Sequence, residues 1–165
     1  MASEAIEWLG DKLRILDQSK LPWEQSFIDL SDYRDVALAI TEMKVRGAPA
    51  IGIAVAYGIA LGAQDITAVN KEEFLVQLSQ IMQAFAATRP TAVNLFQAIN
   101  RMREAAIGDN ISEVKRTLID EAKQIHQEEI EATRRLSWLG AELIQDGFTI
   151  LTHCNAGSLA TAGYG

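Results

Sequence analysis

Residues 47–64, GAPAIGIAVAYGIALGAQ, contain no charged side chain, and their length is near the lower limit for a membrane span. Six alanines and four glycines dilute the hydrophobicity of this stretch. Gly58 and Gly62 form a small-xxx-small pair, and Gly52 and Ala56 form another, which lets a second helix approach closely. Because this spacing works in water as well as in lipid, the stretch predicts a buried central helix rather than a membrane span.

The composition is that of an acidic globular protein. The chain has 165 residues, of which 48% are hydrophobic, and its net charge is −7 with a pI near 4.8. This length is sufficient to bury a core without disulfides or metals. The negative charge excludes the basic face that nucleic acids and anionic membranes require, so we expect neither as a partner. Any phosphate must be held locally, by a few placed groups.

Cysteine and histidine are too scarce to crosslink the fold. Cys154 is the only cysteine, and two histidines cannot complete a structural zinc site with it. The acidic N-terminus has no apolar signal segment. We therefore expect a cytoplasmic protein, and no metal or organic cofactor is implied.

Apolar patterning predicts a small β-structure followed by helices. Two strand-like segments lie near residues 12–16 and 26–30, with a turn at residues 20–22 between them. Helical spacing follows, with starts expected near Ser31, Pro49, Asn70, Thr91 and Ser112, the last helix running to about Gln145. Met43 falls on the apolar side of the first helix, and His126 on the solvent side of the last.

The C-terminal residues predict the beginning of a second unit. Residues 148–152 have the pattern of a buried strand, and a glycine-containing turn follows, as in α/β proteins. A lone strand with half a helix cannot bury itself. We therefore predict an α+β, predominantly helical fold. Residues 1–146 would form a small β-sheet on a bundle of about five helices, and residues 147–165 the truncated start of a Rossmann-like α/β domain.

The start of the buried helix is a candidate anion site. Arg46, Gly47 and Ala48 directly precede Pro49. Helix N-terminal amides attract an anion, and a forked guanidinium suits phosphate oxygens. The alternative is that this sequence only starts a helix while Arg46 pairs with a surface acid, and the residues alone favour that alternative.

Two further stretches carry residues suited to chemistry. Pro90 forces Arg89 out of the helical region, so a second arginine precedes a helix start. Cys154 follows the expected strand, where α/β proteins place ligands, although lone cysteines are usually small buried hydrophobes. His153 is not expected to pair with Cys154, because neighbours on a strand point to opposite faces.

These three stretches are similar to those of a known family. RGAPAIG at 46–52, TRPTAVNL at 88–95 and THCNAGSLAT at 152–161 closely resemble the methylthioribose-1-phosphate isomerases. Those enzymes share a superfamily with the alpha, beta and delta regulatory subunits of translation initiation factor 2B. The resemblance covers the whole chain but a little under half of the family's length. The sequence Cys-Asn-Ala-Gly-Ser at 154–158 narrows the resemblance from the superfamily to the isomerase.

The resemblance implies that the full-length protein isomerises 5-methylthioribose 1-phosphate to 5-methylthioribulose 1-phosphate in methionine salvage. It implies a catalytic role for Cys154, and it implies substrate or phosphate binding by Arg46, Gly47, Ala48 and Arg89, with Asn155, Gly157 and Ser158 as further candidates. The family's catalytic aspartate belongs to its second domain, which this chain lacks, so the fragment alone is expected to be inactive. The family dimerises mainly through that domain, which implies a homodimer of the full-length protein.

Other functions remain open. The full-length protein could be a regulatory subunit of the initiation factor 2B superfamily. It could also be a ribose-1,5-bisphosphate isomerase, in which a Cys-Asn pair is followed by a different sequence. A helical interaction module with incidental resemblance is disfavoured by three ordered matches. An aspartate in a Gly-Ala-Asp-Arg-like context after Gly165 would favour the methylthioribose-1-phosphate isomerase.

Overall fold

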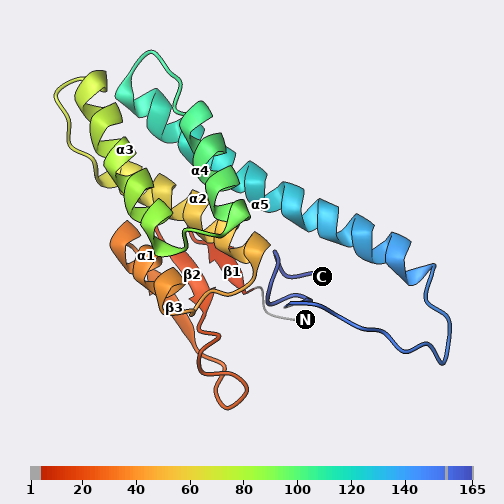
Figure 1. Cartoon of the computed structure of the whole chain (residues 1–165). Helices are drawn as coiled ribbons and strands as arrows, with labels where there is room; N and C mark the ends of the chain where they lie inside the picture. The colour runs from red at the N-terminus through yellow and green to blue at the C-terminus, as the bar shows by residue number, and fades with distance from the viewer. Residues whose placement is uncertain (1–4, 155, 165) are drawn as a thin grey trace.

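A computed structural model describes residues 5–154 and 156–164 (Figure 1). In this part of the chain three strands precede five helices. The strands are β1 (Ile6–Trp8), β2 (Leu13–Leu16) and β3 (Phe27–Leu30), and the helices are α1 (Tyr33–Thr41), α2 (Ala48–Asp65), α3 (Lys71–Thr88), α4 (Val93–Glu104) and α5 (Ile111–Ala141). The predicted α+β, mainly helical fold is confirmed.

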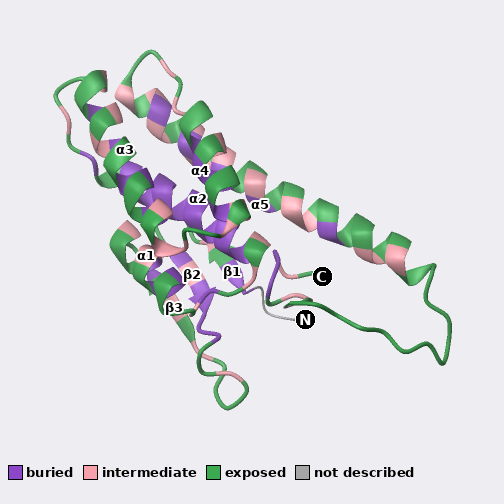
Figure 2. Ribbon diagram, viewed as in Figure 1, coloured by how far each residue is buried: buried purple, intermediate pink, exposed green. Residues whose placement is uncertain are grey.

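Helix α2 is the centre of the protein. Its residues from Ala50 to Ala63 are all buried (Figure 2), and it contacts α1, α3, α4, α5, β1 and β2. The glycines make this crowding feasible, because a Cβ at Gly62 would lie 2.9 Å from the side chain of Ile81. The predicted buried helix with close neighbours is confirmed. Within the described residues, no helix combines the length and apolar character that a membrane crossing needs.

The three strands form an antiparallel sheet in the order β1–β2–β3. Ile15 of β2 pairs with Ile6 on one side and Ile28 on the other, and Ile15 is fully buried in the core. Trp8 of β1 stacks on Tyr57 of α2 with ring centroids 4.9 Å apart, which joins the sheet to the central helix. The sequence predicts β2 and β3 but misses β1, because three residues are too few to show a clear alternation.

Two helices begin at residues other than the predicted ones. Asp32, not Ser31, caps α1, and Asn110, not Ser112, caps α5, each accepting a hydrogen bond from a first-turn amide. A cap must directly precede the first helical residue, whereas Ser31 lies one residue too early and Ser112 lies inside the helix. Asn70 caps α3 as predicted.

Three predictions about exposure are wrong. His126 is buried on α5, where the Tyr57 hydroxyl hydrogen-bonds to its Nδ1 at 3.0 Å. Met43 lies beyond the end of α1 and is 52% exposed. Leu136 and the other apolar residues near the end of α5 are exposed, because this part of the helix extends past the rest of the bundle (Figure 1). Helix α5 also ends at Ala141, before the predicted Gln145.

Residues 148–152 do not form the predicted buried strand. They are irregular, and Leu151 is 95% exposed. A strand needs hydrogen-bonded neighbours, and the sheet of the described residues consists of β1, β2 and β3 alone. The assignment of residues 147–165 to a second domain stays a prediction.

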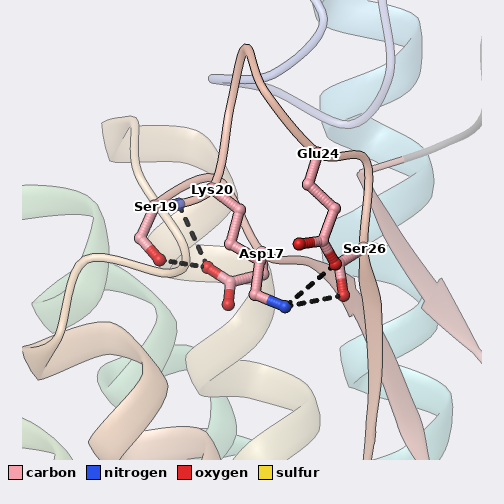
Figure 3. A network of polar contacts seen from close by, with 5 residues as sticks. All are labelled: Asp17, Ser19, Lys20, Glu24 and Ser26. Carbon is pink, nitrogen blue, oxygen red and sulfur yellow. Dashed lines mark hydrogen bonds and ion pairs between the residues drawn. The ribbon is translucent and has the colours of Figure 1, made fainter.

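The loop between β2 and β3, residues 17–26, is held by internal polar contacts (Figure 3). The buried carboxylate of Asp17 accepts hydrogen bonds from the amide and hydroxyl of Ser19 at 3.0 and 2.6 Å. Lys20 donates to Glu24 and Ser26 at 3.1 and 3.3 Å. These contacts hold the loop in a fixed conformation.

Residues 157–164 return to the bundle and pack beside that loop and the start of α2. The carbonyl of Leu159 accepts a hydrogen bond from Nε2 of Gln18 at 2.8 Å. Ala160 and Ala162 are buried, 2% and 4% exposed. The C-terminal turn therefore lies at the same end of α2 as the predicted anion site.

Candidate functional site

The segment between α1 and α2 fixes the backbone next to Arg46. Val45 is buried, and the carbonyl of Lys44 accepts a hydrogen bond from the Gln18 amide at 3.1 Å. Arg46 follows these anchored residues and is itself exposed. Its guanidinium therefore lies on the surface just before α2.

At the start of α2, one backbone amide is bonded to the C-terminal turn, and others have no acceptor among the described residues. The Ala160 carbonyl accepts a hydrogen bond from the Ala50 amide at 3.1 Å, and Pro49 has no N–H. The amides of Gly47 and Ala48 have no acceptor within the described part of the chain. The helix start thus keeps two N–H groups for an anion, fewer than a fully open helix would offer.

Arg89 lies between α3 and α4. Its backbone has φ −143° and ψ 81°, outside the helical region, as the following proline predicts. Its carbonyl accepts a hydrogen bond from the Ala92 amide at 3.0 Å, which closes a turn before α4. The half-buried side chain therefore leaves from a constrained backbone.

These segments meet at one cavity of about 520 Å³. Its lining residues come from three separate parts of the sequence: Met43, Arg46, Gly47, Ala48 and Ile51; Arg89, Thr91 and Ala92; and Cys154. Of the other candidates, Gly157 and Ser158 are not among the described residues that line it, and Asn155 lies outside the described residues. The structure therefore brings Arg46, Arg89 and Cys154 together, and their roles in binding and catalysis stay predictions.

The cavity is cationic. Neither Arg46 nor Arg89 has a carboxylate within ion-pairing distance among residues 5–154 and 156–164. The alternative in which Arg46 pairs with a surface acid is therefore not observed there. Two guanidiniums without acidic partners, together with two free amides, suit an anion with several oxygens, such as a phosphate group.

Cys154 brings a thiol to the cavity. The residue is exposed, and its backbone has φ 67°, which is uncommon for a residue with a side chain. It is not the buried hydrophobe that a lone cysteine usually is. A thiol in this position is accessible to a ligand in the cavity.

Four lining residues are not predicted from the sequence, and they are Met43, Ile51, Thr91 and Ala92. Thr91 and Ala92 directly follow Arg89 and Pro90 before α4. Their position next to a predicted site residue could have identified them as lining residues. Met43 carries no such signal, because its spacing matches the apolar side of α1.

Comparison with known proteins places this chain in a family. The sequence model of the initiation factor 2 subunit family matches residues 44–162. The chain belongs to this family. It is 55% identical over 163 residues to methylthioribose-1-phosphate isomerase of Dehalococcoides mccartyi (strain CBDB1), and 49% identical over 168 residues to that of Geobacter metallireducens. These matches cover 98% and 100% of this chain but 49% of each relative, so the chain spans about half their length.

Two solved structures have the same fold. The crystal structure of 5-methylthioribose 1-phosphate isomerase from Pyrococcus horikoshii OT3 matches with a TM-score of 0.90 and 42% identity, over 98% of this chain and 46% of that one. The structure of translation initiation factor eIF-2B subunit delta from A. fulgidus matches with a TM-score of 0.84 and 42% identity, over 96% and 47%. Family members with this fold therefore carry two different names, an isomerase and a translation factor subunit.

Proposed function

We propose that the full-length protein converts 5-methylthioribose 1-phosphate to 5-methylthioribulose 1-phosphate in methionine salvage. The observation that carries this proposal is the single cavity at which Arg46, Arg89 and Cys154 meet. Relatives named methylthioribose-1-phosphate isomerase match nearly the whole chain, which supports this choice of substrate.

The reaction opens a sugar ring that cannot open freely. The anomeric carbon C1 carries the phosphate, so the ring oxygen must be protonated as its bond to C1 breaks. Hydrogen then moves from C2 to C1, and the C2 hydroxyl becomes the ketone after losing its proton. An enediolate route moves this hydrogen as a proton, and a direct route moves it as a hydride. Both routes conserve atoms and electrons within the sugar.

This chain supplies one side of the site. The guanidiniums of Arg46 and Arg89, with the amides of Gly47 and Ala48, hold and neutralise the phosphate. Cys154 either shuttles a proton or stabilises the transition state. A carboxylic acid from the part of the protein outside this chain flanks the other side of the sugar. An acid in an apolar pocket stays protonated near neutral pH because burial disfavours its charged form.

An activity assay tests whether the site needs both this chain and the acid outside it. It compares turnover of 5-methylthioribose 1-phosphate by the full-length protein and by the 165-residue chain. We expect activity from the full-length protein only, because the acid and the cavity must act together on one substrate. Appreciable turnover by the chain alone would contradict it. Cys154→Ser in the full-length protein should abolish most activity with an unchanged circular dichroism spectrum. Undiminished activity of that variant would overturn the role of the thiol.

The second candidate function is a regulatory subunit, which the similarity to the A. fulgidus structure favours. A regulatory subunit would bind a sugar phosphate or other subunits without turnover. The exposed thiol in the cationic cavity supports the isomerase instead. We also propose that the full-length protein is a cytoplasmic homodimer. We further propose that it has no nucleic-acid or membrane partners, which the net charge of −7 on this 165-residue chain supports.

A further inference from the structure

Met43 occupies a backbone position that suits glycine better than methionine. It follows the last turn of α1 with φ 60°, in the left-handed region. Its amide donates to the Ile40 carbonyl at 3.2 Å, and the Lys44 amide donates to the Ala39 carbonyl at 2.9 Å, which ends the helix. Glycine is the usual residue at such a helix end because a Cβ is strained there. The helix ending alone therefore does not account for a long side chain at this position.

The side chain of Met43 lies outside the core. The Glu42 amide donates to the Leu38 carbonyl at 2.8 Å, and the Glu42 carboxylate pairs with Lys44 at 2.6 Å. Val45, two residues on, fills the core instead and is 1% exposed. Met43 thus remains 52% exposed and lines the same cavity as the two arginines and the thiol.

The lining of that cavity has a positively charged part and an apolar part. Arg46 and Arg89 supply positive charge, whereas Met43 and Ile51 supply apolar surface. A sugar phosphate whose far end is neutral and apolar matches both parts, because its phosphate and its apolar substituent need different surroundings. The unbranched thioether of methionine is adaptable and polarizable, so it packs well against a small sulfur-containing group.

We propose that Met43 is a specificity-determining residue that contacts the methylthio group of the substrate. This inference rests on the proposed function. It accounts for a strained, exposed methionine where glycine would fit more easily, since backbone strain of this kind persists where a site requires it. Met43 then favours a methylthio group over a hydroxyl or a second phosphate on C5 of the sugar.

The test compares two substrates in the full-length protein. Met43→Gly should lower kcat/KM for 5-methylthioribose 1-phosphate by roughly tenfold, the usual effect of losing one small apolar contact. The kcat/KM for ribose 1-phosphate, which has a hydroxyl at C5, should change much less. Met43→Leu, which keeps an apolar side chain of similar size, should retain the preference for 5-methylthioribose 1-phosphate over ribose 1-phosphate. Thermal stability of Met43→Gly should be unchanged or higher, because the backbone strain is removed.

Two outcomes would overturn the role of Met43. An equal fall of kcat/KM for both substrates would show that the residue only positions Arg46, and kcat/KM values that stay at the wild-type level for both substrates would show that it does not contact the methylthio group. A wild-type protein without turnover of 5-methylthioribose 1-phosphate would refute the proposed function, and this inference with it. The wild-type assay therefore separates the two failures.

Discussion

Gly47 and Ala160 lie so close together that a side chain at position 47 would overlap the backbone and the Cβ of Ala160. Gly47 also has φ 95°, which side chains disfavour. Immediately after it, the Ala50 amide donates to the Ala160 carbonyl at 3.1 Å. The glycine therefore serves two purposes, because it lets the C-terminal turn dock on α2 and leaves open backbone at the cavity.

We expect Gly47→Ala to destabilise the protein by more than about 1 kcal/mol, from backbone strain and from the overlap with Ala160. Urea unfolding measures the change, and hydrogen exchange should show lost protection in residues 157–164. Gly140→Ala is the matched control, because a Cβ at Gly140 in α5 meets no atom within 4 Å. That control should be neutral or stabilising by up to about 1 kcal/mol. Equal stability of the two variants would contradict the close packing at Gly47.

A second close approach lies inside the core, between Gly58 of α2 and Phe85 of α3. A Cβ at Gly58 would overlap the tip of the Phe85 ring and lie 3.1 Å from Val36. Gly58→Ala should therefore cost about 1–3 kcal/mol by overpacking. In a double-mutant cycle measured by urea unfolding, Phe85→Leu should recover part of this loss because it removes the overlapping ring atoms. Strict additivity of the two changes would show that this contact does not limit the packing.

The proposed phosphate-binding role of the two arginines can be tested by removing their charge. Arg46→Met and Arg89→Met in the full-length protein should each raise KM for the sugar phosphate, because a charge-assisted hydrogen bond contributes about 1.5–3 kcal/mol. That corresponds to roughly 10- to 150-fold. Arg135→Met, at an exposed position of α5, is the matched control and should leave KM unchanged. A comparable effect at all three positions would indicate loss of net charge rather than a phosphate site.

The ionised carboxylates of two neighbouring glutamates on α5 should contribute to the free energy of unfolding with opposite signs. The Arg101 guanidinium hydrogen-bonds to Glu128, and this contact, with a smaller one from Gln124, lowers the pKa of the Glu128 carboxyl below its ordinary value. Burial raises the pKa of the Glu129 carboxyl. The Glu128 contribution is therefore present above the unfolded-state pKa, and it is lost as pH falls through the lower folded pKa.

Glutamine variants at these two positions show the difference at pH 7. Glu128→Gln should be less stable than the wild type by under about 1 kcal/mol, because the pair is partly exposed. Glu129→Gln should be equally or more stable, because it removes a charge whose burial is unfavourable. Both differences should shrink as urea unfolding is repeated toward pH 3, where the carboxyls become neutral. Differences of the same sign at pH 7 would contradict this assignment.

Local pattern was enough to predict much of the fold. The apolar, glycine-spaced stretch at 47–64 predicts the central helix, and Asn70 predicts the start of α3. Caps at Ser31 and Ser112 were wrong because several polar residues before a helix can satisfy the same pattern. The buried state of His126 could not be predicted, since its partner Tyr57 is 69 residues away in sequence. A long-range contact of this kind does not alter the sequence pattern around either residue.

The sequence by itself determined which residues are candidates for anion binding or catalysis, because charge, proline geometry and a thiol are properties of single residues and their neighbours. Only the tertiary structure decided that Arg46, Arg89 and Cys154 line one cavity, since the packing of α2 against α4 and the return of the C-terminal turn bring them together. It also decided that Met43 joins them. Helical spacing places Met43 in the core, but the left-handed end of α1 turns the chain before that position is reached.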